Sequence, residues 1–178
     1  MKNKAYDLVV IALFVALMAI CAWITIPAAV PFTMQTFGVF LALLLLGGKR
    51  GAICMAVYLL LGAVGVPVFS GFRGGVGALV GSTGGYLVGF IVSALLMWAL
   101  TGFARRSRLT LAVAMAVSLL ACYAFGTVWF VVVSVRAGKA MTFGAALSMC
   151  VLPYILPDAA KLWLAYFLSK RLKKFVKA

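Results

Sequence analysis

Histidine is absent from this 178-residue sequence, and aspartate and glutamate together occur only twice. Hydrolytic and metal-assisted catalysis take their acids, bases and ligands largely from these side chains, so an enzyme would be poorly supplied. Neither a G-x-x-x-x-G-K-(S/T) phosphate loop nor a G-x-G-x-x-G motif occurs, which excludes a recognisable nucleotide-driven motor. The four cysteines form no C-x-x-C pair and lie in apolar segments, so we expect buried thiols and no metal site.

Apolar residues make up 67% of the chain and charged residues only 10%. Soluble domains are about 45–50% apolar and about 25% charged, and a soluble fold of this length could not bury so much apolar surface. A membrane-spanning helix needs ~20 mostly apolar residues, and six such helices with their turns account for the whole length. We therefore predict an all-α integral membrane protein: one compact bundle of six transmembrane helices, forming a single domain over residues 1–178.

Six apolar segments carry this prediction, each bounded by glycine, proline or clustered cations. They are residues 6–26, 36–46, 51–66, 84–103, 109–135 and 143–168. The first segment is longer than the ~7–15-residue apolar core of a signal peptide, so we expect it to be retained as a span.

The cations are distributed unevenly around these segments. Twelve of the sixteen fall on the side that holds both termini, and three fall on the other. The larger group is Lys2, Lys4, Lys49, Arg50, Arg105, Arg106, Arg108, Lys170, Arg171, Lys173, Lys174 and Lys177, and the smaller is Arg73, Arg136 and Lys139. Cytoplasmic loops carry the excess of Lys and Arg, so we predict a cell-membrane protein with both termini in the cytoplasm. Because the cations cluster between apolar segments, we expect no nucleic-acid partner.

The sixteenth cation, Lys161, and the acid Asp158 lie within the last apolar segment. A charge at that depth costs at least ~2.5–3.5 kcal/mol on insertion scales. The two residues share a helix face at three-residue spacing, and Pro153 and Pro157 just before them can kink the span. One interpretation is a substrate site in which Asp158 accepts hydrogen bonds and Lys161 offers charge. The other is a self-neutralising pair that only fixes helix packing.

A short proline-bounded stretch precedes the second segment. Its polar residues Thr33, Gln35 and Thr36 either line a pocket or cap the following helix, and the sequence leaves both open.

Ten of the eighteen glycines fall between residues 62 and 89. We expect the long apolar loop over residues 65–75, which contains Arg73, to fold back as a lid. Small residues at positions 81, 85, 89 and 93 form a row suited to close helix packing. Tyr86, next to Gly85 in the sequence, is either an interface aromatic or a pocket wall.

The first segment carries a small-residue face of its own. Ala12, Ala16 and Ala19 line one side of it, and such faces pack helices either within the bundle or against another protein.

Taken in order, these elements resemble the BioY family of biotin transporters. The matching stretches are PFTMQT at 31–36, LGGKRG at 46–51, YLLLGAVGVPVFSG at 58–71, GSTGGYL at 81–87, GTVW at 126–129 and PYILPDAAK at 153–161. Two positions depart from the family's usual pattern: Ser82 replaces a proline, and Pro157 replaces a glycine.

The resemblance implies a six-helix, non-enzymatic subunit that captures biotin from outside the cell with high affinity. It would work in the lipid bilayer with a transmembrane coupling protein and two ATPase subunits, as an energy-coupling-factor (ECF) transporter, and would need no cofactor. Asp158 would accept the ureido N–H groups, and Lys161 or Arg73 would meet a carbonyl or the carboxylate. Tyr86, Gln35 and Thr33 would supply further hydrogen bonds. Ala12 and Ala16 would contact the coupling protein.

Two alternatives remain open at this point. The same subunit could bind another small vitamin-like substrate, or the chain could be a structural membrane subunit that transports nothing.

Overall fold

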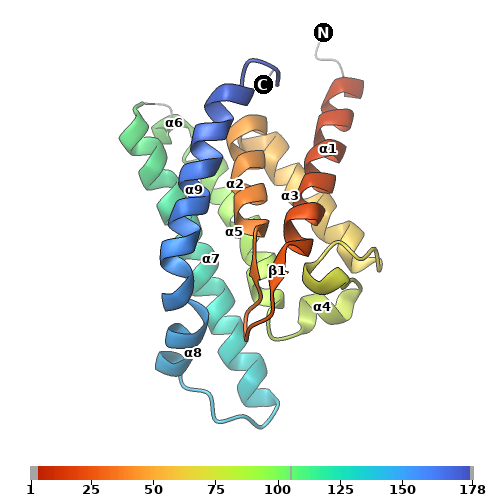
Figure 1. The fold of residues 1–178 in the computed structure, drawn as a ribbon, viewed down its shortest axis with the longest axis vertical. Coiled ribbons are helices and arrows are strands. Elements are labelled where there is room, and N and C mark those ends of the chain that lie inside the picture. Colours follow the sequence, from red (N-terminus) through yellow and green to blue (C-terminus); the bar gives the residue numbers. More distant parts are fainter. Residues whose placement is uncertain (1–3, 105, 177–178) are drawn as a thin grey trace.

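The computed structural model describes residues 4–104 and 106–176, which are almost entirely helical (Figure 1). The helices are α1 (Lys4–Trp23), α2 (Gln35–Leu46), α3 (Gly48–Ala63), α4 (Val76–Val80), α5 (Gly84–Ala99), α6 (Thr101–Ala104), α7 (Arg108–Arg136), α8 (Phe143–Cys150) and α9 (Leu152–Leu172). A 3-10 turn, η1 (Ser70–Phe72), and two short strands, β1 (Thr25–Ile26) and β2 (Phe32–Thr33), complete the chain. Lys2, Arg105 and Lys177 of the charge count lie outside the described residues.

The six predicted apolar segments correspond to α1, α2, α3, α5, α7 and the α8–α9 pair, so the apolar helical bundle is confirmed. Among the described helices, α1 and α7 are long and apolar enough to span a membrane, and α8 with α9 forms a third such unit bent by 41°. Helix α2, with 12 residues, is shorter. It extends about 18 Å, against the ~30 Å of a bilayer core. The number of six spans stays a prediction.

Apolar side chains occupy both the inside and the outside of the bundle. Met18, Phe40 and Met55 are fully buried, whereas Leu8 and Leu156 are among many large apolar side chains that point outwards. Such an outer surface suits lipid rather than water.

The bend between α8 and α9 lies at Val151, next to Pro153 at the start of α9. Pro157 lies inside α9, where it cannot donate the usual hydrogen bond to the carbonyl of residue 153. A bend is therefore present in the last apolar segment, at the α8–α9 junction close to Pro153, whereas Pro157 lies within the unbroken helix α9.

The row of small residues packs α5 against α7, as expected. A side chain at Gly85 would collide with Trp129, and one at Gly89 would collide with Cys122. The Ser93 hydroxyl donates to the carbonyl of Ser118 at 2.7 Å. Position 81 does not belong to this row: Gly81 ends α4 in extended backbone, before α5 begins.

A two-stranded hairpin follows α1, where the sequence predicted continued helix to residue 26. Strands β1 and β2 pair antiparallel with Thr25 opposite Thr33 and Ile26 opposite Phe32. Pro27 explains the correction, since the residue before a proline is driven out of the helical region and into extended backbone. The hairpin, labelled at β1 in Figure 1, lies below α2. It also contacts α9, since the rings of Phe32 and Tyr154 lie 5.9 Å apart between centroids.

The ends of the bundle separate the two groups of described cations. The start of α1, the turn between α2 and α3, α6 and the end of α9 lie at one end (Figure 1). The hairpin, η1, α4 and the α7–α8 loop lie towards the other end. Which end faces the cytoplasm stays a prediction.

Helix α1 exposes Ala12 and Ala16 but buries Ala19. Of the three alanines, the first two therefore face outwards, whereas Ala19 packs within the bundle.

Candidate functional site

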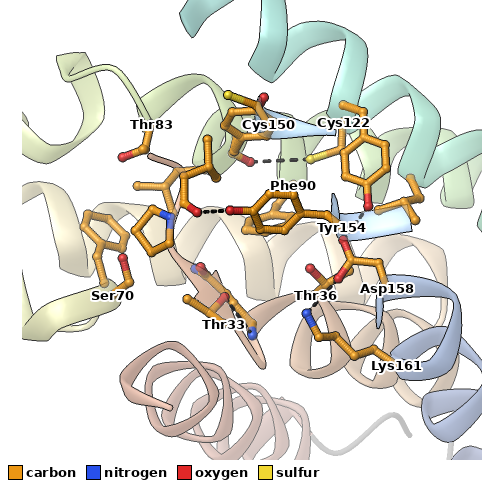
Figure 2. Close-up of a pocket in the computed structure, with 18 of the residues that line it drawn as sticks. Thr33, Thr36, Ser70, Thr83, Phe90, Cys122, Cys150, Tyr154, Asp158 and Lys161 are labelled. Atoms are coloured by element: carbon orange, nitrogen blue, oxygen red, sulfur yellow. Dashed lines mark hydrogen bonds and ion pairs between the residues drawn. The ribbon is translucent and has the colours of Figure 1, made fainter. Parts of the chain in front are cut away.

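A cavity of about 750 Å³, including its mouth, reaches from the middle of the bundle towards the hairpin end (Figure 2). Its walls come from the hairpin, the start of α2, the loop after α3, and helices α4, α5, α7, α8 and α9. All six residues predicted to bind substrate line it: Thr33, Gln35, Arg73, Tyr86, Asp158 and Lys161. These six residues, up to 128 positions apart in sequence, thus meet at one site, whose size suits a small molecule.

Asp158 and Lys161 form a buried ion pair in the cavity wall. The Lys161 ammonium donates to Asp158 Oδ1 at 2.7 Å, and the Tyr123 hydroxyl donates to Asp158 Oδ2 at 2.5 Å. Asp158 is 3% exposed and Lys161 6%. Partners are required at this depth, because removing one member leaves an uncompensated buried charge.

Both charged groups keep hydrogen-bonding capacity towards the cavity. Each carboxylate oxygen can accept two hydrogen bonds, and the ammonium has three protons, of which one is directed at Asp158. The ammonium also lies 4.0 Å from the centroid of the Phe32 ring, which further stabilises its charge. The site therefore presents an acceptor and a donor side by side to a ligand.

Gln35 belongs to a hydrogen-bonded chain that ties the cavity to the loop after α3. Its side-chain amide donates to the Tyr58 hydroxyl at 2.7 Å, which in turn donates to the carbonyl of Val68 at 2.8 Å. The Phe69 ring packs edge-on against Tyr58 with 5.6 Å between centroids. These contacts hold the loop against α2 and α3.

The loop over residues 65–75 folds back onto the bundle and forms part of the cavity wall, as expected. Arg73, which is exposed, lines the cavity and donates from Nε to the carbonyl of Ser70 at 3.2 Å. Phe72 stacks on Trp23 with 5.0 Å between centroids, and Trp23 donates to the carbonyl of Pro67 at 2.8 Å. Gly71 takes a φ of +68° within η1, a conformation that favours glycine.

Thr33 lines the cavity and lies just before Met34, the N-cap of α2, whose side chain makes no capping hydrogen bond. The Thr33 hydroxyl accepts from the backbone N–H of Gln35, the first residue of α2, at 3.2 Å. Thr36 is buried at the cavity wall as well.

Tyr86 is likewise both packed and exposed to the cavity. Its hydroxyl shares a 3.1 Å hydrogen bond with the Thr127 hydroxyl, and its ring lies directly over Gly126. Glycine at 126 is what allows this ring to lie flat on α7 beside the site.

Sequence reasoning missed several lining residues, above all Tyr123 and Tyr154. The Tyr154 hydroxyl donates to the carbonyl of Val30, which ties α9 to the hairpin (Figure 2). Tyr154 lies four residues before Asp158 on the same helix face, so helical spacing could have found it. Tyr123 lies on another helix, and no local pattern connects it to Asp158.

The four cysteines are buried, as expected, although Cys122 and Cys150 also line the cavity, which the sequence did not predict. Within residues 4–104 and 106–176, no three His, Cys, Asp or Glu side chains come together as a metal site would require.

Comparison with known proteins places the chain in a family. The model of the BioY family matches residues 1–178. The chain belongs to the BioY family. The resemblance inferred from the six motifs is thereby confirmed, and BioY membership places the chain among transport proteins rather than enzymes.

Two BioY relatives match over nearly their whole lengths. The biotin transporter BioY of Thermotoga maritima is 41% identical over 169 residues, covering 94% of this chain and 96% of the relative. A probable biotin transporter BioY of Pyrococcus horikoshii is 36% identical over 171 residues, covering 96% and 98%. A solved structure, the S-component for biotin from an ECF-type ABC transporter, superposes with a TM-score of 0.83 at 25% identity, covering 98% of this chain and 95% of that one.

Proposed function

We propose that this chain captures biotin with high affinity, without a cofactor of its own, and delivers it as the substrate-binding membrane subunit of an ECF-type transporter. The observation that carries the proposal is the buried Asp158–Lys161 pair in the wall of a small-molecule cavity. BioY family membership and the likeness to a biotin S-component support it.

The deep end of the cavity matches the ureido ring of biotin. That ring carries N–H donors beside a carbonyl acceptor, and the cavity presents a carboxylate and an ammonium 2.7 Å apart. Asp158 accepts from a ureido N–H while Lys161 donates to the ureido carbonyl. A buried polar site of this kind rejects analogues that lack the matching groups.

The remaining groups suit the rest of the ligand. Arg73, exposed in the lid loop, meets the carboxylate of the biotin tail. The rings of Phe90 and Tyr154 form apolar wall for the sulfur-containing ring. Gln35, Thr33 and Tyr86 supply further hydrogen bonds along the cavity.

We propose that partner subunits supply the ATP hydrolysis, as the likeness to the S-component of an ECF-type ABC transporter suggests. We propose a transmembrane coupling protein and two ATPase subunits, with Ala12 and Ala16 of α1 against the coupling protein. Both alanines are exposed, and small side chains allow close helix approach. The cation-rich end, with both termini, faces the cytoplasm of the cell membrane, and the cavity end faces outwards.

Binding of labelled biotin to the purified protein in detergent tests the proposal. We expect Asp158→Asn to weaken binding roughly 10- to 100-fold, because a hydrogen bond to a charged group contributes about 1.5–3 kcal/mol. Ala16→Leu, on the outer face of α1, is the control. The purified variant should bind biotin normally, whereas cells that carry it together with the partner subunits should lose biotin uptake. Unchanged biotin affinity in both Asp158→Asn and Lys161→Ala would reject the site assignment.

A further inference from the structure

A second cavity lies away from the proposed biotin site, at the end of the bundle where α1 begins and α9 ends, which we call the terminal end. It encloses about 1130 Å³ including its mouth, among the ends of α2, α5, α6, α7 and α9. Three of its lining residues are cations: Arg108, at the start of α7, and Lys170 and Lys173, at the end of α9. Tyr166 and Ser169 add hydroxyl groups.

An apolar groove continues from this cavity along the outside of the bundle. Arg108, Tyr166 and Lys170 line both features. The groove walls are Ala112 and Met115 on α7, and Ala159, Leu162 and Trp163 on α9. At 1.5 Å per residue the groove follows α7 for about 10 Å and α9 for about 16 Å. Helix α7 packs mainly on α5 and α9 mainly on α2, which leaves this seam between α7 and α9 open.

Among the described residues, no carboxylate pairs with the cations around the cavity. The whole chain has two acidic side chains. One, Asp7, pairs with Arg50 at 3.0 Å, and the other, Asp158, pairs with Lys161. Within the described part of the chain, no acidic side chain is therefore left for Arg108, Lys170 or Lys173. The N-terminal end of the 29-residue helix α7 adds further positive potential at the same place.

One lining group also requires an acceptor. The Tyr166 hydroxyl is buried and has no hydrogen-bond partner among residues 4–104 and 106–176. The Lys170 ammonium lies 4.5 Å from the centroid of the same ring, so this tyrosine joins the basic cluster to the groove.

We propose that the cavity and groove form one binding site for an anionic phospholipid. The lipid phosphate lies between Arg108 and Lys170, and one acyl chain follows the groove between α7 and α9 past Trp163. Such a lipid combines the two properties that the surface complements: negative charge at the mouth and a continuous apolar chain beside it. Anionic headgroups attract membrane-proximal cations by about 1 kcal/mol per Lys or Arg. The proposal does not depend on which substrate the first cavity binds.

Native mass spectrometry of the purified protein, titrated with phosphatidylglycerol or with phosphatidylcholine of the same chains, tests this site. The variant Arg108→Gln/Lys170→Gln should bind phosphatidylglycerol roughly thirtyfold more weakly, the equivalent of about 1 kcal/mol per cation. Arg106→Gln/Lys174→Gln is the control. It makes the same charge change at the same end of the bundle, at exposed residues that line neither cavity nor groove, and should bind like the wild type.

A second pair of variants tests the acyl groove without changing charge. Ala112→Trp, at an exposed groove position, should fill the groove and reduce phosphatidylglycerol binding. Val113→Trp, on the neighbouring face, should leave binding unchanged. Equal phosphatidylglycerol binding by both double variants would overturn the proposal, and so would normal binding by Ala112→Trp. If inorganic phosphate displaced bound phosphatidylglycerol as effectively as free lipid does, the site would bind an anion without using the acyl groove. That result would also contradict the proposal.

Discussion

Two ion pairs among the described residues lie in opposite surroundings. Asp7 on α1 and Arg50 on α3 meet at 3.0 Å near the terminal end, with side chains 28% and 22% exposed. Asp158 and Lys161 meet at 2.7 Å inside the bundle, with side chains 4% and 7% exposed, and Tyr123 donates a second hydrogen bond to Asp158. The first pair joins two helices, whereas the second lies within one helix and faces a cavity.

This difference bears on the choice between packing and binding. An accessible ion pair contributes about 0–1 kcal/mol, and a buried pair is often no more stabilising than apolar residues of similar volume. A buried pair within one helix is therefore a poor device for holding helices together. Its position in the cavity wall favours the binding interpretation over the purely structural one.

The largest expected effect comes from breaking the buried pair. Lys161→Ala should lower the free energy of unfolding by about 3–5 kcal/mol, because it leaves the Asp158 carboxylate buried without its counter-charge. The measurement is unfolding in mixed detergent micelles.

The apolar double variant Asp158→Leu/Lys161→Met sharpens this test. Stability should return to about the wild-type value or above it, while biotin binding should be lost. A double variant that is stable and still binds biotin would refute the role of the pair in the site.

The next effect isolates Tyr123, the second partner of Asp158. Tyr123→Phe removes only the hydroxyl that donates at 2.5 Å, and should lower stability by about 1.5–3 kcal/mol, the range for hydrogen bonds to charged groups. Tyr6→Phe is the control at the terminal end, where the hydroxyl makes an exposed 3.5 Å contact to the carbonyl of Phe175. Equal decreases in melting temperature for Tyr123→Phe and Tyr6→Phe would contradict the expectation that the buried hydrogen bond contributes more stability than the exposed one.

A substitution beside the cavity tests close packing without changing charge. Gly126→Ala forces a methyl group into the Tyr86 ring and should cost about 1–3 kcal/mol, with weaker biotin binding as the ring moves. Gly144→Ala makes the same change on α8 where no atom lies close, and should leave both measurements unaltered. If Gly126→Ala had the melting temperature and the biotin affinity of the wild type, the Tyr86 ring would be free to move away from the added methyl group.

The smallest effect belongs to the accessible pair. Asp7→Asn should change stability by less than about 1 kcal/mol, and salt should reduce the difference further. The comparison is of thermal unfolding at low and high salt. A loss as large as that of Lys161→Ala would remove the distinction between the two pairs.

Much of the fold follows from local patterns. Each apolar segment forms helix. In lipid there is no water to bond the backbone N–H and C=O groups, so they must pair with one another within the segment. The hairpin after α1 escaped prediction because two-residue strands leave almost no periodic signal. Pro27 alone marked the place where the first helix had to stop.

The site residues that could be predicted are those whose charge or polarity is unusual for the apolar sequence around them. Asp158 and Lys161 stand out as charges in an apolar segment, and the polar residues at 33 and 35 stand out beside prolines. Tyr123 and Phe90 do not, because aromatic side chains are as common in packed cores as in cavity walls.

The sequence by itself determined that the chain is embedded in a membrane and forms apolar helices. It also determined that Asp158 and Lys161 are too costly to be buried without partners. Those conclusions rest on composition and on the free energy of transferring charge, which need no coordinates. Only the tertiary structure decided that the pair shares a cavity with Arg73 and Tyr86, that Tyr123 completes it, and that α7 and α9 leave a basic, apolar seam between them. Contacts between residues far apart in sequence depend on how the helices pack, and helix packing is a property of the whole bundle.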